Sequence, residues 1–326
     1  MILAGDIGGT KTNLAYFSTD GDRLVLSTFK SYMSREFGSL NEVIDRFTHE
    51  HPASIHHAAF GIAGPIVDAT SKLTNLGWNV DARDVASLLR LDSVGLLNDL
   101  EATSYGVLRL GEGEKIILQE GTPQPRAAIA VIAAGTGLGE GGLVWDGKRY
   151  RSLPSEGGHT DFGPRNELEM NLLRFLLTKY DRVSHERVVA GPGVFNLYAF
   201  FRNRAQYPEP TWLTAQMKQG DPSAVISTAG SEGKDPVCVQ ALDLFVSLYG
   251  AEAGNLALKI LATGGVYVGG GIAPKMLRKM QEGSFLESFV NKGRYTDLLK
   301  RIPVYVVLND RTALMGAAHY ALVMND

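Results

Sequence analysis

The chain has 326 residues, with 32 basic and 35 acidic side chains and a net charge of −3, so it lacks the basic excess that nucleic acid or an anionic membrane surface would need. Its 44% hydrophobic and 21% charged residues exclude a disordered or collagen-like chain, and a single cysteine excludes an internal disulfide. Because no apolar run reaches the ~18 residues that cross a bilayer and no secretion signal is recognisable, we expect a cytoplasmic protein. The length favours two domains.

Strands alternate with helices along the chain, which is the pattern of an α/β fold. The expected strands are residues 2–4, 13–17, 23–30, 56–62, 94–97, 127–134, 141–145, 148–153, 266–268 and 302–308. The expected helices are residues 39–50, 81–90, 99–108, 166–180, 192–202, 236–262, 274–280 and 312–324. Residues 220–235, rich in Gly, Ser, Asp and Pro, are expected to form a mobile loop, and residues 112–124 to separate two halves.

Three glycine clusters each follow an apolar run of strand length. They span residues 5–10, 135–139 and 264–271. A strand that runs into glycines is typical of a place where the backbone approaches a ligand closely. The third cluster precedes a helix that begins near Pro274, and it suits either a ligand or a plain strand–helix connection.

The first two clusters repeat one pattern. In each, a strand reaches a Gly-Thr turn, a second strand follows, and an Asp-Gly pair at the same interval turns the chain into a third strand. This spacing favours an internal duplication. Only the first copy carries a carboxylate, Asp6, where the second has Ile132. Backbone N–H groups of two such turns are suited to phosphates, and Asp6 to the Mg²⁺ that accompanies a nucleotide, whereas the alternative is two tight turns without a ligand.

Two other nucleotide motifs fail on their context. Residues 137–142 match the dinucleotide pattern G-x-G-x-x-G, but strand and turn residues follow where that motif must open a helix. Residues 142–148 approach a Walker A loop, but Arg149 replaces the required Ser or Thr and the segment is a hairpin.

Polar side chains stand where apolar runs end. Asp99 follows the strand at 94–97, where it serves either as a helix N-cap or as a functional carboxylate. Glu156 and His159 flank two glycines in a loop, the arrangement of a binding constellation. Glu186 precedes a Gly-Pro-Gly segment and either reaches a cleft or pairs on a helix surface.

Five separated motifs give the chain a resemblance to the bacterial ATP-dependent glucokinase family, within the actin, heat-shock-70 and sugar-kinase superfamily. They are LNDLEA (97–102), PSEGGHTDFGP (154–164), VSHERVVAGPG (183–193), GGVYVGGGI (264–272) and KGRY (292–295). The resemblance implies an α/β two-domain actin-like ATPase (ribonuclease-H-like) sugar-kinase fold with a cleft between the domains. The small domain is expected to comprise residues 1–110 with 310–326, and the large domain residues 111–309.

The resemblance also implies ATP-dependent phosphorylation of the 6-hydroxyl of D-glucose. It assigns the catalytic base to Asp99, and sugar binding to Asn98, Asp99, Glu156, His159 and Glu186. It assigns nucleotide binding to Gly5, Asp6, Ile7, Gly8, Gly9, Thr10, Gly135, Thr136, Gly137, Gly270 and Gly271, and Mg²⁺ to Asp6. The implied partners are glucose and Mg-ATP, and the implied assembly is a homodimer.

Two departures concern the choice of sugar. Lys11 stands where this group usually has Asn, and residues 61–65 also resemble the related repressor/open-reading-frame/kinase family. That family usually carries a cysteine-rich zinc motif after its Glu-x-Gly-His segment, and residues 160–164 contain no cysteine. The alternatives are therefore a kinase of mannose or N-acetylglucosamine and, from another class, an actin- or chaperone-like ATPase. A sugar-sensing repressor is disfavoured, because we expect no DNA-binding domain before Gly5.

Overall fold

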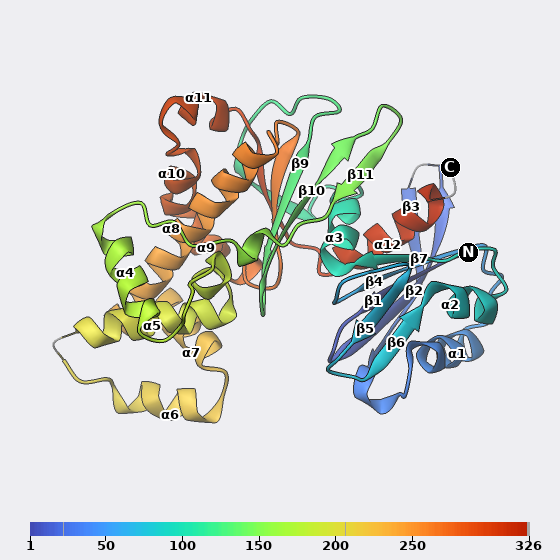
Figure 1. Cartoon of the computed structure of the whole chain (residues 1–326), viewed down its shortest axis with the longest axis horizontal. Coiled ribbons are helices and arrows are strands. Elements are labelled where there is room, and N and C mark those ends of the chain that lie inside the picture. Colours follow the sequence, from blue (N-terminus) through green and yellow to red (C-terminus); the bar gives the residue numbers. More distant parts are fainter. Residues whose placement is uncertain (22, 206, 325–326) are drawn as a thin grey trace. The chain divides into compact units, whose positions relative to one another are not determined.

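The computed structural model describes residues 1–21, 23–205 and 207–324, and the chain divides into two compact units (Figure 1). Unit 1 comprises Met1–Glu114, Ser152–Pro154 and Asn309–Asp326, and unit 2 comprises Lys115–Arg151 and Ser155–Leu308. Among the described residues, no helix combines the length and apolar character needed to cross a bilayer.

Unit 1 is built on a five-stranded sheet in the order β3-β2-β1-β4-β7, with a separate two-stranded hairpin of β5 and β6. Its strands are β1 (Ile2–Ile7), β2 (Lys11–Asp20), β3 (Arg23–Met33), β4 (His57–Ile62), β5 (Thr70–Leu73), β6 (Trp78–Asp81) and β7 (Gly95–Asn98). Its helices are η1 (Ser34–Glu36), α1 (Leu40–Glu50), α2 (Ala82–Leu89), α3 (Asp99–Val107) and α12 (Thr312–Val323).

Helices cover both faces of this sheet because alternate residues of its strands point to opposite sides. In β1, Leu3 and Ile7 pack into one apolar core with residues of α1. Ile2 and Ala4 pack into a second core with residues of α12. The C-terminal helix is therefore part of the core of the N-terminal unit.

Helices α3 and α12 approach each other more closely than ordinary side chains allow. A Cβ atom added at Gly316 of α12 would lie 2.7 Å from the carbonyl carbon of Ala102 and 2.5 Å from the nitrogen of Gly106, both in α3. Because atoms of opposing backbones occupy that space, glycine is the residue that permits this crossing. The crossing fixes α3, the helix that begins at Asp99.

Unit 2 contains a six-stranded sheet in the order β11-β10-β9-β12-β13-β8. Its strands are β8 (Lys115–Gln119), β9 (Ile129–Ala134), β10 (Leu138–Trp145), β11 (Tyr150–Leu153, whose last residues belong to unit 1), β12 (Gly265–Gly269) and β13 (Val304–Val307). Its helices are η2 (Gly157–His159), α4 (Glu167–Leu177), η3 (His185–Arg187), α5 (Gly191–Arg204), α6 (Thr211–Gln219), α7 (Pro222–Ser231), α8 (Pro236–Lys259), η4 (Pro274–Met276), α9 (Leu277–Gln281), α10 (Ser284–Val290), η5 (Gly293–Tyr295) and α11 (Thr296–Leu299).

The two sheets share one topology. In unit 1 a hairpin of β1 and β2 pairs with parallel β4 and then β7, and in unit 2 a hairpin of β9 and β10 pairs with parallel β12 and then β13. β3 and β11 occupy the same outer position in the two orders. This correspondence is the arrangement that an internal duplication predicts.

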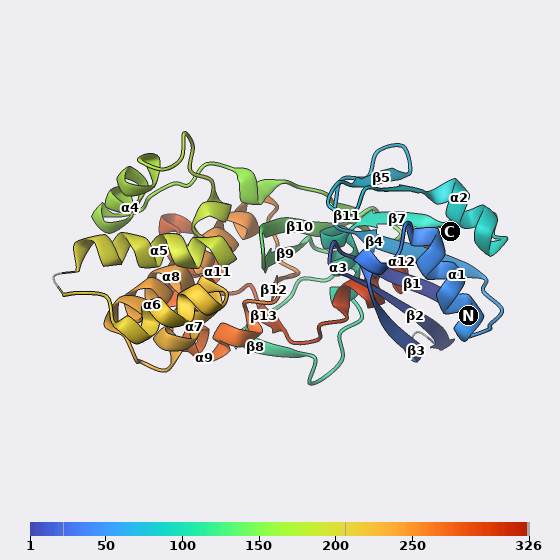
Figure 2. The same ribbon diagram turned by 90° about the horizontal axis from the view of Figure 1, so that it is seen from below.

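One expected element is wrong. Residues 220–235 were expected to form a mobile loop, but most of that segment is helix α7, which packs beside α5 and α8 (Figure 2). The Asp221 side chain accepts a hydrogen bond from the Ser223 nitrogen at 3.0 Å, and Pro222 occupies the first turn. Ile226 and Ala229 are buried in the core of unit 2. The Asp and Pro that suggested a loop are thus the start of a helix.

Candidate active site

Unit 1 brings its predicted site residues to one edge of its sheet. β1, β4 and β7 are parallel, Asp6 pairs with Gly61, and Ile62 pairs with Asn98. Asp6 and Asn98 therefore lie at the carboxyl ends of strands separated by one strand, about 10 Å apart by strand spacing. This edge is where α/β sheets bind ligands.

The start of α3 distinguishes the two interpretations of Asp99. The N-cap is Asn98, whose Oδ1 accepts from the Leu100 nitrogen at 2.9 Å and whose Nδ2 donates to the Gly64 carbonyl at 3.1 Å. Asp99 is the first helical residue and is exposed, although its Oδ1 also accepts from the Leu100 nitrogen. Since Asn98 caps the helix, capping alone does not account for Asp99.

Asp6 is a partly buried acid whose charge has little compensation. The Asn13 amide donates to its Oδ2 at 3.3 Å. Burial raises the pKa of Asp6, and the hydrogen bond from Asn13 opposes that rise. Desolvation of a carboxylate is offset when a cation binds it, so Asp6 suits Mg²⁺. The described residues contain no cluster of three or more metal-ligating side chains, and Mg²⁺ characteristically takes one or two carboxylates with water and phosphate oxygens.

The first Gly-Thr turn follows Asp6 directly. The Gly8 nitrogen donates to the Lys11 carbonyl at 2.9 Å, and the Ser34 hydroxyl donates to the Gly8 carbonyl at 2.8 Å. Thr10 is exposed. Gly5, Asp6 and Ile7 belong to β1, and the Ile7 side chain is fully buried, so only its backbone is available to a ligand. The hydrogen bonds of Gly8 and Ser34 fix the turn, and Thr10 is its exposed side chain.

The second Gly-Thr turn lies beside the third glycine cluster in unit 2. The Gly135 nitrogen donates to the Gly137 carbonyl at 2.8 Å, and the Ile272 nitrogen donates to the Ala134 carbonyl at 3.2 Å. Gly270 has φ of +79° and packs against Ala134, which explains glycine at that position. Segments far apart in the sequence thus meet at the ends of the neighbouring parallel strands β9 and β12.

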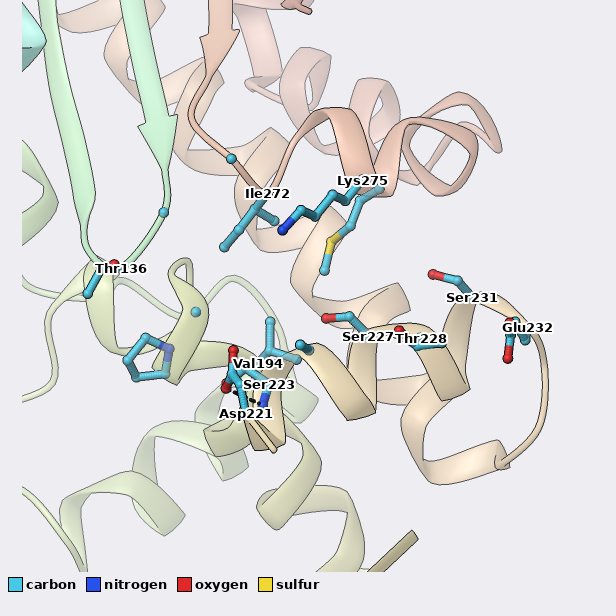
Figure 3. A pocket seen from close by; sticks show the side chains of 16 residues that line it. Thr136, Val194, Asp221, Ser223, Ser227, Thr228, Ser231, Glu232, Ile272 and Lys275 are labelled. Atoms are coloured by element: carbon cyan, nitrogen blue, oxygen red, sulfur yellow. Dashed lines mark hydrogen bonds between the residues drawn. The ribbon is translucent and has the colours of Figure 1, made fainter. Parts of the chain in front are cut away.

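A pocket of about 1000 Å³ opens at this junction. Figure 3 shows Thr136 at one end, Ile272 and Lys275 along one wall, and Ser227 of α7 along another. It is lined by Gly135, Thr136, Gly191, Pro192, Val194, Asp221, Ser223, Ala224, Ser227, Thr228, Ser231, Glu232, Gly271, Ile272, Lys275 and Met276. The first residues of α5 also line it, and a helix N-terminus favours an anion. The pocket combines polar side chains and a helix N-terminus with an apolar wall.

Two of the remaining predicted sugar ligands, His159 and Glu186, lie beside the second turn. His159 Nε2 lies 4.0 Å from Glu186 Oε2. The same Glu186 oxygen accepts a hydrogen bond from the Leu138 nitrogen at 3.1 Å, directly after the Gly-Thr turn. A Cβ atom at Gly158 would lie 2.9 Å from the Leu138 carbonyl carbon, so the loop that carries Glu156 and His159 packs directly on β10.

The predicted residues therefore fall into two groups. Asp6, Asn98 and Asp99 share the strand edge of unit 1, while His159, Glu186 and the second Gly-Thr turn are neighbours in unit 2. Glu156 precedes η2 and is exposed.

The sequence interpretation missed the contribution of α7 to the pocket and the buried Glu140 of β10. The Asp221-Pro222 pair is a helix-start signal and could have predicted α7. No local signal marked Glu140.

Comparisons with known proteins agree on one class. A solved glucokinase from an Antarctic psychrotroph superposes with a TM-score of 0.89 at 30% identity, covering 100% of this chain and 99% of that one. A glucokinase of the repressor/open-reading-frame/kinase (ROK) family from Streptomyces griseus, in complex with glucose and AMPPNP, has a TM-score of 0.64 at 20% identity and covers 98% and 99%. The fold is thus the actin-like two-domain fold of sugar kinases.

The sequence comparisons identify one family within this class. The family model described as Glucokinase matches residues 3–324. The glucokinase of Nostoc sp. (strain PCC 7120) is 44% identical over 334 residues, covering 98% of each chain. The chain belongs to the glucokinase family, as its motifs predict.

Proposed function

We propose that this protein transfers the γ-phosphoryl group of ATP to the 6-hydroxyl of D-glucose. The observation that carries the proposal is the hydrogen bond between Glu186 and the Leu138 nitrogen. This bond places a residue proposed to bind the sugar directly beside a turn proposed to bind the phosphates. In the proposal, glucose, which accepts the phosphoryl group, and ATP, which donates it, are therefore held side by side. An ATPase that only hydrolyses nucleotide has no use for such a pairing.

Phosphoryl transfer needs positioning and charge neutralisation more than covalent help from the protein. In the proposed mechanism the two Gly-Thr turns hold the phosphates through backbone N–H groups. Asp99 accepts the proton of the attacking hydroxyl, a contribution of ~10²–10⁴ in rate. Asn98, Glu156, His159 and Glu186 bind the other hydroxyls. Asp6 would hold Mg²⁺, which neutralises phosphate charge when bound.

The nucleotide is proposed to occupy the pocket beside Thr136, with the turn of Gly270 and Gly271 that follows β12 next to it. Support comes from the pocket, where Thr136 and Lys275 stand near an apolar wall that includes Ile272. A flat ring against the apolar wall and phosphates toward the turn is the orientation that this lining favours.

Three further parts of the proposal rest on the resemblance. We propose two domains, residues 1–110 with 310–326 and residues 111–309; the two compact units support this division. We also propose a homodimer that acts in the cytoplasm. Sedimentation equilibrium of the purified protein tests the dimer, and a single monomeric species would contradict it.

The test of the proposed function compares sugars at fixed ATP and Mg²⁺. We expect kcat/KM for glucose to exceed that for mannose by at least ~10-fold and that for N-acetylglucosamine by more, because a mispaired buried hydrogen bond costs ~1–3 kcal/mol. A preference for either of the other sugars would overturn the choice of glucose. ATP hydrolysis that is equally fast without any sugar would favour the ATPase alternative.

A further inference from the structure

A buried acid lies directly beneath the loop that carries Glu156 and His159. Glu140 of β10 is 1% exposed, and no N–H or hydroxyl group among the described residues donates to either of its carboxylate oxygens. A Cβ atom at Gly157 would lie 3.0 Å from the Glu140 carboxyl carbon. The carboxyl group of Glu140 is therefore packed against the first residue of η2.

The Tyr249 hydroxyl of α8 contacts the carbonyl of Ile132, the β9 residue that pairs with Glu140. Glu252, one turn after Tyr249 in α8, is the acid next to Glu140 and is fully buried but well partnered. Its Oε1 accepts from Lys259 Nζ at 3.0 Å, and its Oε2 accepts from Asn255 Nδ2 at 2.7 Å. His185 Nε2 lies 3.0 Å from the same Oε2. Because two facing carboxyl groups make a hydrogen bond only when one carries a proton, and Glu252 already has these partners, the proton belongs on Glu140. Burial and the charge of Glu252 raise the pKa of Glu140 to about 8.

Glu252 also fixes the second sugar loop. His185 is the first residue of η3, and burial lowers its pKa, so its neutral ring donates from Nε2 to Glu252. The His185 nitrogen donates to the Thr160 carbonyl at 3.0 Å, which joins η3 to the end of η2. The next residue, Glu186, is a proposed sugar ligand. A chain of contacts thus runs from Gly157 through Glu140, Glu252 and His185 to Glu186.

We propose that Glu140 is a positioning residue that donates a hydrogen bond from its carboxylic acid to Glu252 and thereby supports both loops that present Glu156, His159 and Glu186 to the sugar. The proposal rests on the proposed function, because it assumes that these loops bind glucose. Glu140 itself faces the interior and touches no substrate.

The arrangement makes sugar binding sensitive to alkaline pH. Glu252, Lys259 and Tyr249 of α8 interact electrostatically with Glu140. His185 of η3 lies behind Glu252, and Gly157 of η2 packs against the Glu140 carboxyl. One cation, Lys259, already pairs with Glu252. When Glu140 ionises, a second buried negative charge faces Glu252 and the supporting hydrogen bond is lost. We expect KM for glucose to rise by at least ~5-fold between pH 7 and pH 9.5, while KM for ATP stays constant over the same range.

The deciding variant is Glu140→Gln, which keeps the shape and carries an amide that donates to Glu252 at any pH. We expect its KM for glucose at pH 7 to lie within ~3-fold of the parent value and to lack the alkaline rise. The matched control is Glu169→Gln, which changes another fully buried acid of unit 2, one paired with Arg165 and outside both sugar loops. The control should retain the alkaline rise.

The proposal is overturned if Glu140→Gln keeps the alkaline rise, if the parent shows none, or if KM for ATP rises as much as KM for glucose. A second readout does not depend on catalysis: in protein labelled with ¹³C at glutamate side-chain carboxyls, one signal should titrate near pH 8 and be missing from Glu140→Gln. Absence of glucose phosphorylation would refute the proposed function and leave this titration measurable. Activity on glucose without any carboxyl titrating above pH 7 would refute the role of Glu140 alone.

Discussion

Replacing Gly316 by alanine tests whether the crossing of α3 and α12 holds Asp99 in place. The new methyl group would lie 2.7 Å from the Ala102 carbonyl carbon and 2.5 Å from the Gly106 nitrogen. Optimal contacts between such atoms are ~3.5–4.0 Å, and the Ala102 carbonyl oxygen lies closer still to the new methyl group, so the helices must separate by more than about 1 Å. Both neighbouring atoms belong to backbone, which cannot rotate away as a side chain does.

The magnitude follows from two opposed effects. Overpacking in a core costs ~1–3 kcal/mol and occasionally more, and a backbone obstacle places this site at the upper end. Alanine in a helix interior offsets ~1 kcal/mol of that cost relative to glycine. We expect unit 1 to lose about 2 kcal/mol of stability, which lowers its unfolding temperature by about 5 °C.

The assay is thermal unfolding followed by circular dichroism, together with steady-state kinetics. Since α3 begins at Asp99, we expect kcat for Gly316→Ala to fall as the helix moves. Gly163→Ala is the stability control, because a Cβ at Gly163 meets nothing within 4 Å. A variant Gly316→Ala with parental unfolding temperature and kcat would refute the argument that this close crossing positions α3.

Three further predictions concern single side chains. Asp99→Asn should lower kcat by at least ~10²-fold without changing the unfolding temperature, and near-parental turnover would remove Asp99 as the base. Asp6→Ala should raise KM for Mg-ATP at least ~10-fold while calorimetry still detects glucose binding. The control Asp20→Ala, at an exposed position of β2, should change neither KM for Mg-ATP nor glucose binding. Equal loss of Mg-ATP and glucose binding in Asp6→Ala would indicate misfolding instead. Burial and Arg109 lower the pKa of His319 to about 4. As the pH falls, the unfolded chain therefore binds a proton at His319 before the folded protein does, so the free energy of unfolding should fall between pH 6.5 and pH 4 by up to about 3 kcal/mol. Urea unfolding of His319→Gln should show a smaller fall over this range. Identical pH slopes for the parent and the variant would contradict this prediction.

The sequence carried enough information for the sheets and the glycine turns. Apolar runs that end in glycine mark strand ends by backbone chemistry alone, as at Gly5. Asn98 and Asp99 follow the apolar run at residues 94–97, so the edge that carries Asp6 and Asn98 was predictable. The glucokinase motifs added the family, and the proposed roles of the side chains rest on that resemblance. The duplication was visible as spacing and corresponds to the shared order of the two sheets.

Other features depend on long-range packing and had no local signal. Glu140 is buried beside Glu252, a residue of a helix much later in the chain, and nothing near Glu140 in the sequence predicts that meeting. The Ser152 hydroxyl donates to Glu101 at 2.7 Å, a contact that makes the end of β11 part of unit 1. The residues on either side of Ser152–Pro154 in the sequence belong to unit 2. Helix α7 was missed because Asp and Pro mark both loops and helix starts, and only the burial of Ile226 separates the two cases.

The place of α12 in unit 1 sets an order of events during synthesis. Proteins are made from the N-terminus at ~5–20 residues per second, and domains generally fold as units once they are complete. One face of the N-terminal sheet packs on Leu314, Ala317, Ala318 and Ala321, which are translated after every residue of unit 2. All residues of unit 2 are therefore synthesised before α12, the helix that covers one face of the first strands of unit 1. The earliest part of the chain to be made is the last to be finished.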